Sequence, residues 1–250
     1  MDTALRLLLF EDPRSRVAVS YSEKVLNLAT ANLLGYWRLQ EAAGSNADNF
    51  EGTAARDGTY TGVTLGQDGI GDGLTCPLFD GANDFVDVFS ASLNTAFVGA
   101  EGTLSAWARV SGVGVWTDGS HRHLITIARN TTTDRIHLKK ISVDNRLEWL
   151  REGANTIDSV TRTDESTTDW FHMAITWSEA ADEVRAYFDG AQEGVTQTGL
   201  GTASDILQAA NCNIGAQTDT PNRSWDGRLA HVALWDTPLT AAQILDIATL

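Results

Sequence analysis

Short segments in which apolar and polar residues alternate recur along most of the chain, and they restrict the fold more than any other feature. In TLSAWARV the apolar face carries Leu104, Ala106, Ala108 and Val110. In WFHMAITW it carries Phe171, Met173, Ile175 and Trp177. A period of two residues is typical of strands, and the separating runs of Gly, Asp, Asn and Thr favour turns. We therefore expect ten or more antiparallel strands arranged as a sandwich.

Two further segments add detail to this pattern. EVRAYFDG ends in Asp189-Gly190, a strong short signal for a hairpin turn. RLAHVALW alternates Leu229, Ala233 and Trp235 around His231, which predicts a strand with these three side chains on one face.

Helical patterns are confined to the two ends of the regular region. YSEKVLNLATANLL places Val25, Leu26 and Leu28 on one possible helical face. Near the C-terminus, Thr240 and Gln243 have the spacing of a capping box, in which each residue satisfies a backbone N–H of the first helical turn. We expect a short last helix that lies on the sandwich.

Residues 1–20 precede the regular pattern and are interrupted by Pro13, so we interpret them as an N-terminal arm before a sandwich domain of residues 21–250. The arm contains the apolar run LRLLLF, with candidate docking residues Leu5, Leu7, Leu9 and Phe10. Such a run either adds a strand to its own sheet or docks onto a neighbouring subunit or larger particle. Both alternatives stay open, and the second includes a homo-oligomer.

The charge of the chain restricts its partners. There are 33 Asp and Glu against 18 Lys and Arg, a formal net charge of −15. A chain this acidic has no basic surface for nucleic acid or anionic lipid. The apolar run near the N-terminus follows Asp2 and lacks a small-residue cleavage site, so we expect neither a signal peptide nor a membrane insertion.

Two cysteines, Cys76 and Cys212, lie in apolar, strand-like segments. They either pair across neighbouring strands or remain buried free thiols that pack as small hydrophobic residues.

Eight segments occur in an order that resembles one known family. They are GYWRLQEAAG, DGTYTG, LFDGANDFVDV, LSAWARV, DWFHMAITW, VRAYFDGAQEG, NIGA and WDGRLAHVALWDTPLTAAQI. This series resembles laminin G-like, concanavalin A-like lectin/glucanase domains, of the kind found in phage structural and bacterial surface proteins. The resemblance covers residues 21–250 and implies an all-β, antiparallel two-sheet jelly roll. In such a fold we expect Trp37 to fill the core.

Glucanases share this fold, so the resemblance raises the question of catalysis. Those enzymes hold two carboxylates about 5 Å apart across a sugar. Asp182 and Glu183 are adjacent and therefore point to opposite faces of a strand. Glu148 and Glu152 flank WLR without the required period. No common nucleophile or metalloprotease motif is present either, and we predict a non-catalytic protein.

Metal binding has two candidate sites. His121 and His123 form an H-x-H pair without a carboxylate in register, so zinc is not expected. The polar loop that follows Trp37 and runs to Gly52 is called the rim loop below. Its oxygen donors Asp48, Asn49 and Glu51 suit calcium, with a solvated turn as the alternative.

The resemblance also implies a structural calcium in many relatives, which carry an acidic pair at the position of Ala230-His231. This departure removes an expected ligand.

Carbohydrate binding requires exposed aromatic rings beside polar side chains. The candidates are Trp116, Asp118, His121, Arg122 and Trp225, which lie in two Gly- or Pro-containing loop segments. The alternative is that both indoles fold back onto the sandwich.

These observations lead to three hypotheses of function. The first is a virion structural protein, such as a head-decoration or tail component, that binds glycans or neighbouring subunits. The alternative is a secreted or surface carbohydrate-binding adhesion module, and the third is a glycoside hydrolase. The first two place the protein in a virion or outside the cell.

Overall fold

The computed structural model describes residues 19–142, 145–220 and 222–250, and every structural statement below concerns these residues. The docking residues expected in the N-terminal arm, Leu5, Leu7, Leu9 and Phe10, lie outside them.

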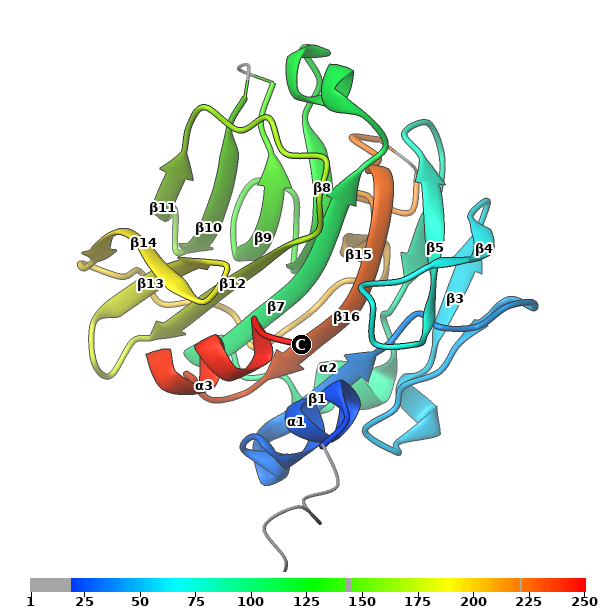
Figure 1. The fold of residues 1–250 in the computed structure, drawn as a ribbon. Helices are drawn as coiled ribbons and strands as arrows, with labels where there is room; N and C mark the ends of the chain where they lie inside the picture. Colours follow the sequence, from blue (N-terminus) through cyan, green and yellow to red (C-terminus); the bar gives the residue numbers. More distant parts are fainter. Residues whose placement is uncertain (1–18, 143–144, 221) are drawn as a thin grey trace, which may run out of the picture.

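Two antiparallel sheets of eight strands each form the described part of the chain, which confirms the expected sandwich (Figure 1). The first sheet contains, in spatial order, β14 (Ala191–Gln197), β13 (Glu183–Phe188), β12 (Phe171–Ser178), β7 (Glu101–Val110), β16 (Asp226–Trp235), β5 (Thr75–Asp80) and β4 (Thr64–Asp68), and β1 (Leu33–Trp37) also pairs with β16. The second contains β11 (Thr156–Arg162), β10 (Leu147–Gly153), β9 (Arg135–Lys140), β8 (Arg122–Ala128), β15 (Cys212–Ile214), β6 (Phe85–Asp87), β3 (Gly58–Thr61) and β2 (Asn46–Ala47).

The main core lies between the sheets and is built by the alternation seen in the sequence. All eight apolar residues expected on the inner faces of β7 and β12 belong to this core. Trp37 is fully buried in it, as expected. Burying a large apolar side chain contributes roughly 1.5–3 kcal/mol to folding, so these faces hold the two sheets together.

The outer face of the first sheet is also buried, because α1 (Tyr21–Asn27) and α3 (Ala241–Ile247) lie against it (Figure 1). Trp107, on the outer side of β7, donates its indole N–H to the Tyr21 hydroxyl at 2.8 Å. That hydroxyl donates in turn to the backbone oxygen of Ile247 at 2.7 Å. The two helices and the sheet are therefore joined by one chain of buried hydrogen bonds.

The predicted terminal helices are present, and each begins with a capping box: Ser20 with Glu23 for α1, and Thr240 with Gln243 for α3. The expectation that helices are confined to the ends is wrong, because α2 (Ala91–Ala96) follows β6. The Ser90 side chain accepts a hydrogen bond from the backbone N–H of Leu93 and caps this helix. Four short 3₁₀ turns complete the elements of the described residues: η1 (Thr30–Asn32), η2 (Ala54–Arg56), η3 (Val113–Thr117) and η4 (Ala209–Asn211).

Asp189-Gly190 forms the predicted turn between β13 and β14, with φ of 46° and 80°. Positive φ at both central residues is the requirement of a type I′ hairpin, and glycine meets it without a steric penalty.

A β-bulge in β16 corrects the expected facing of RLAHVALW. The pairing of β16 with β7 shifts between Ala230 and Ala233, and His231 adopts a left-handed φ of 50°. The extra residue moves the following side chains to the other face. Leu229 therefore lies in the main core, whereas Ala233 and Trp235 pack under the helices.

Cys76 and Cys212 are free and fully buried. Cys76 packs on the outer side of the first sheet, and Cys212 packs in the core between the sheets. The structure therefore confirms the alternative of two buried thiols.

Four histidines are buried with lowered pKa values: His123, His137, His172 and His231. Burial lowers the pKa of His172 to about 3, and neither of its ring nitrogens has a hydrogen-bond partner in the described structure. In acid the unfolded chain takes up protons that the folded chain excludes. Stability due to these histidines is thus complete above their ordinary pKa and is lost as the pH falls below it.

The substitution His172→Phe tests this proton linkage. One histidine with so low a pKa costs about 2 kcal/mol of stability at pH 5 relative to neutral pH. We expect the variant to lose about 2 kcal/mol less than the wild type between pH 7 and pH 5, measured by urea unfolding. His121→Gln, at a half-buried position, is the control and should change the pH dependence of the unfolding free energy less. If His172→Phe loses as much stability between pH 7 and pH 5 as the wild type, the explanation is contradicted.

Candidate functional site

The predicted carbohydrate platform of Trp116 and Trp225 is wrong, because their side chains are 1% and 0% exposed. The turn η3 folds back over the end of the sandwich and places the Trp116 ring 6.1 Å from that of Phe171. The Trp116 indole N–H donates to the backbone oxygen of Thr167. Neither indole presents a face on which a sugar could stack.

The structure brings Asp118, His121 and Arg122 together beside η3. The Asp118 carboxylate accepts from Arg122 at 2.5 Å and from the fully buried Lys140 at 2.6 Å. Burial alone would raise the pKa of Asp118, but these two cations and the Ser120 backbone N–H lower it. The His121 ring contacts Ser142 at 3.2 Å.

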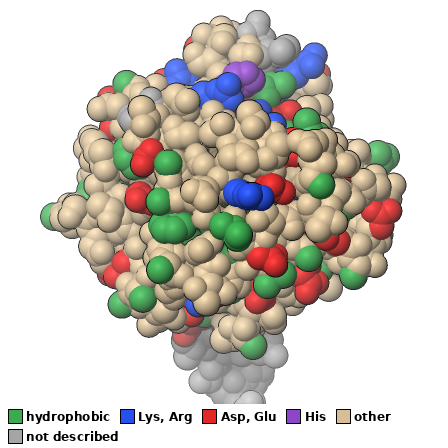
Figure 2. Space-filling view, turned by 180° about the vertical axis from the view of Figure 1, so that it is seen from behind, with side chains coloured by type: hydrophobic (Ala, Val, Ile, Leu, Met, Phe, Trp, Pro, Cys, Tyr) green, Lys and Arg blue, Asp and Glu red, His purple; other side chains and the backbone are tan. Residues whose placement is uncertain are grey.

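A polar depression of about 250 Å³ lies at this end of the molecule, lined by Gly81, Ser120, His121, Arg122, Arg223 and Ser224. Figure 2 shows Lys and Arg side chains gathered beside a histidine at the same end. The hydrogen bonds of Asp118 and Arg122 hold the segment after η3 in place, and carbohydrate binding by these residues stays a prediction.

The role of Asp118 as the counter-ion of Lys140 can be tested by a double substitution. Asp118→Asn leaves a buried ammonium group without its carboxylate, and we expect a loss of about 3 kcal/mol in the free energy of unfolding. Adding Lys140→Met removes the buried charge and should restore at least half of that loss. Urea unfolding of the wild type, both single variants and the double variant measures the effect. A double variant less stable than Asp118→Asn would contradict the assignment.

The side chains of the calcium candidates Asp48, Asn49 and Glu51 all take part in hydrogen bonds. The Asn49 side-chain oxygen accepts from the backbone N–H of Tyr36 at 2.8 Å, and its nitrogen donates to Glu51. Glu51 also accepts from the backbone and hydroxyl of Thr53.

The loop thus uses the side-chain oxygens of Asn49 and Glu51 in its own hydrogen bonds. In the described residues no group of three or more His, Cys, Asp or Glu side chains is placed to hold a metal ion. Calcium binding stays a prediction that a titration with and without chelator would measure.

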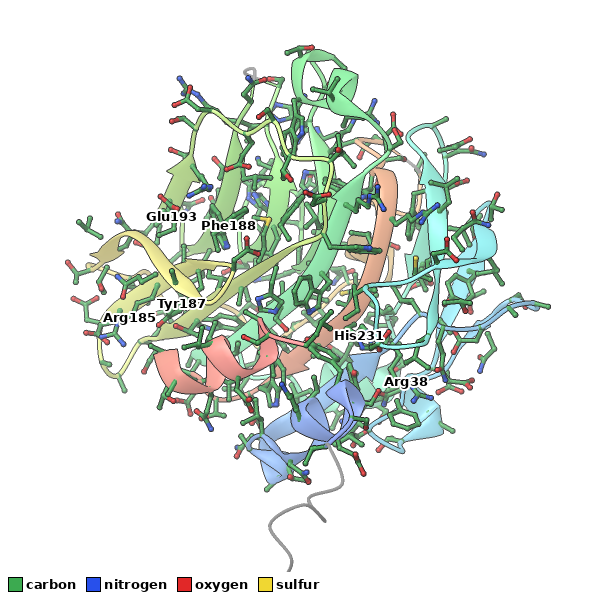
Figure 3. All side chains as sticks on the ribbon, in the orientation of Figure 1. Arg38, Arg185, Tyr187, Phe188, Glu193 and His231 are labelled. Atoms are coloured by element: carbon green, nitrogen blue, oxygen red, sulfur yellow. The ribbon has the colours of Figure 1, made fainter. Side chains whose placement is uncertain are left out.

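A second pocket lies between α1 and the rim loop. Its volume is about 370 Å³, within the range of small-molecule sites. It is lined by Ser20, Tyr21, Ser22, Glu23, Leu26, Arg38, Phe50, Asp72 and Leu74. Figure 3 shows Arg38 and His231 close to α1 and the end of β1.

Phe50 and Arg38 form one wall of the pocket. Phe50 is 37% exposed, which is unusual for a phenylalanine, and the guanidinium carbon of Arg38 lies 3.2 Å from its ring centroid. The Tyr36 ring supports Phe50 edge-on at 6.2 Å. Burial lowers the pKa of Arg38, and its neighbours, among them Glu41, Asp48 and Asp72, oppose that shift in part. An arginine remains a cation in a protein at neutral pH.

Asp72 also lines the pocket, and a chain of buried hydrogen bonds holds its carboxylate. Its carboxylate contacts His231 Nε2 at 2.9 Å and accepts from the backbone N–H of Leu74. His231 Nδ1 lies 2.6 Å from the Tyr36 hydroxyl. Because burial lowers the pKa of His231, the ring is neutral at pH 7, and both contacts are satisfied if Nε2 donates and Nδ1 accepts.

The electrostatics leave Asp72 ionised. Burial raises the pKa of its carboxyl group, but the hydrogen bond from His231 and the backbone bond outweigh that effect, and the pKa is lowered overall. The pocket therefore contains a fixed anion and a cation beside an exposed aromatic ring.

Sequence reasoning missed this pocket. Arg38 lies at the start of the rim loop and Phe50 near its end, whereas Asp72 comes from a separate glycine-rich turn. No spacing motif links them, and the bulge that orients His231 has no signal in the sequence. The one signal for this pocket in the sequence was a phenylalanine, Phe50, in a loop rich in small polar residues.

The fold is that of a known family. A family model described as the concanavalin A-like lectin/glucanases superfamily matches residues 79–245, about two thirds of the chain. The chain belongs to this superfamily.

Two curated relatives match parts of the chain. The stress response protein NST1 of Phaeosphaeria nodorum is 27% identical over 161 residues, which is 61% of this chain and 13% of that protein. Human neuronal pentraxin-1 is 30% identical over 86 residues, which is 32% of this chain and 20% of that protein. The matched segments thus span no more than a fifth of either relative.

Solved structures share the fold at low sequence identity. Domain 4 of the extracellular arabinanase AbnA from Geobacillus stearothermophilus, solved with arabinotriose, has a TM-score of 0.63 and 16% identity, covering 87% of this chain and 98% of that one. A Trypanosoma rangeli sialidase with sialic acid gives 0.62 and 14%, with 87% and 33% covered. The binding domain of botulinum neurotoxin serotype D gives 0.60 and 14%, with 87% and 51% covered.

Across the described ranges, no helix has the length and apolar character needed to cross a membrane.

Proposed function

We propose that this chain is a non-catalytic carbohydrate-binding module and that the pocket between α1 and the rim loop is its glycan site. One observation carries the proposal: an exposed aromatic ring, a cationic fork and an ionised carboxylate line the same pocket of about 370 Å³. Phe50, Arg38 and Asp72 supply these three groups.

The chemistry of the pocket suits a sugar ring. Apolar C–H faces of sugars pack on aromatic and aliphatic side chains, which Phe50, Leu26 and Leu74 supply. Sugar hydroxyls both donate and accept hydrogen bonds. Arg38 is a pure donor and Asp72 a pure acceptor, so the two groups together can hold neighbouring hydroxyls.

The non-catalytic part of the proposal rests on how the pocket's carboxylates are used. Asp72 accepts from His231 and the backbone, and Glu23 accepts from both the backbone N–H and the hydroxyl of Ser20. Glu23 caps α1 in this arrangement. Neither acid is set up as a free nucleophile or general acid.

The comparisons support the carbohydrate-binding alternative over the virion role, for which the relatives and structures named above give no support. Two of the structural relatives were solved with arabinotriose or sialic acid bound, and one belongs to an extracellular enzyme. We extend sugar binding and an extracellular location to this chain as part of the proposal.

Replacing the aromatic or the cationic wall tests the site. We expect Phe50→Ala and Arg38→Met each to weaken binding at least tenfold on an array of immobilised oligosaccharides, a loss of about 1.4 kcal/mol. Arg185→Met is the matched control, because Arg185 pairs with Glu183 on β13, away from the pocket (Figure 3). Thermal unfolding of each variant checks the fold.

Two results would count against the proposal. The first is a wild-type protein that binds no oligosaccharide on the array. The second is equal weakening by Arg38→Met and Arg185→Met.

A further inference from the structure

The pocket that we propose as the glycan site offers one cation to its ligand. In the described residues the Arg38 side chain has no carboxylate within 4 Å and makes no hydrogen bond. Its guanidinium carbon lies 3.2 Å from the centroid of the Phe50 ring. A guanidinium fork can donate two parallel hydrogen bonds to adjacent oxygens.

Negative charge outnumbers this cation. Asp72 and Glu23 line the same pocket, and the charges of Glu41 and Asp48 also act on Arg38. The chain as a whole carries a formal charge of −15. A ligand carboxylate at Arg38 would therefore also lie in the same pocket as the Glu23 and Asp72 carboxylates, which repel it.

The Asp72 carboxylate is ionised at neutral pH. The contact with His231 and the backbone bond from Leu74 keep the Asp72 carboxylate ionised and fixed. A neutral diol can donate to this carboxylate while it accepts from Arg38. A sugar carboxylate at the same place cannot donate.

We propose that the pocket selects neutral sugars through a pair of adjacent hydroxyls bridging Arg38 and Asp72, and that it rejects the corresponding acidic sugars. This inference rests on the proposed function, because it assigns the ligand class of the same site. Glu23 and Asp72 provide the rejection, and Arg38 with Asp72 provides the selection.

The experiment compares neutral oligosaccharides with counterparts that carry carboxylates. The probes are trisaccharides of galactose against galacturonic acid, trisaccharides of glucose against glucuronic acid, and lactose against sialyllactose. We expect the neutral member of at least one pair to bind, and its acidic counterpart to bind at least tenfold more weakly at 50 mM salt. The ratio should shrink at 500 mM salt, because salt screens the repulsion.

Two substitutions test whether residues of the pocket cause the preference for neutral over acidic sugars. Asp72→Asn removes the fixed anion, so we expect the preference for the neutral sugar to fall from tenfold or more to about twofold, with weaker neutral binding. Glu23→Gln keeps a capping residue at the third position of α1 and should lower the preference severalfold. Glu183→Gln changes the total charge equally on β13 and should leave the preference at its wild-type value.

Each outcome is decisive. Acidic sugars that bind as tightly as their neutral partners overturn the inference while leaving the proposed function intact. A preference that falls equally in Asp72→Asn and Glu183→Gln also overturns it, because the selection would then come from the total charge. If no member of any pair binds, the proposed function fails and the inference fails with it.

Discussion

The burial of both faces of the first sheet is the constraint on which the rest of the structure depends. A sheet in a sandwich usually exposes its outer face to water, but here α1 and α3 cover it (Figure 1). The Tyr21 hydroxyl joins Trp107 of β7 to the end of α3 and so fixes where α1 lies. Because α1 forms one side of the proposed glycan pocket, the packing of a second hydrophobic layer determines the position of the site.

The bulge in β16 is the second element that the pocket requires. It turns His231 to the helical side of the sheet, where the ring reaches Asp72 and the backbone N–H bonds to the carbonyl of Arg38. A left-handed backbone at a non-glycine residue carries strain, which persists when the surroundings hold it in place. Buried contacts to Asp72 and Tyr36 hold it here.

The alternating segments predicted the architecture correctly, because period-two burial in β7 and β12 is a local property of the sequence. The same rule failed within β16, since one extra residue in a bulge inverts every later side chain and leaves no local signal. Trp116 and Trp225 were expected in projecting loops, but η3 folds back and buries the first in the core. The pocket was beyond prediction because its walls come from segments that only tertiary packing joins.

The distribution of charge shows how Arg38 differs from the fully buried cations Lys140 and Arg151. Lys140 and Arg151 are fully buried, and each is neutralised by carboxylates within the fold, Asp118 for the first and Glu179 with Asp158 for the second. Buried cations of this kind need such partners, because an uncompensated charge in the interior is strongly destabilising. Arg38 has no such carboxylate within 4 Å in the described residues and rests instead on an aromatic ring at a pocket wall. A cation whose hydrogen-bonding capacity is not used by the fold is available to a ligand, and the acidic surroundings restrict that ligand to one without a negative charge.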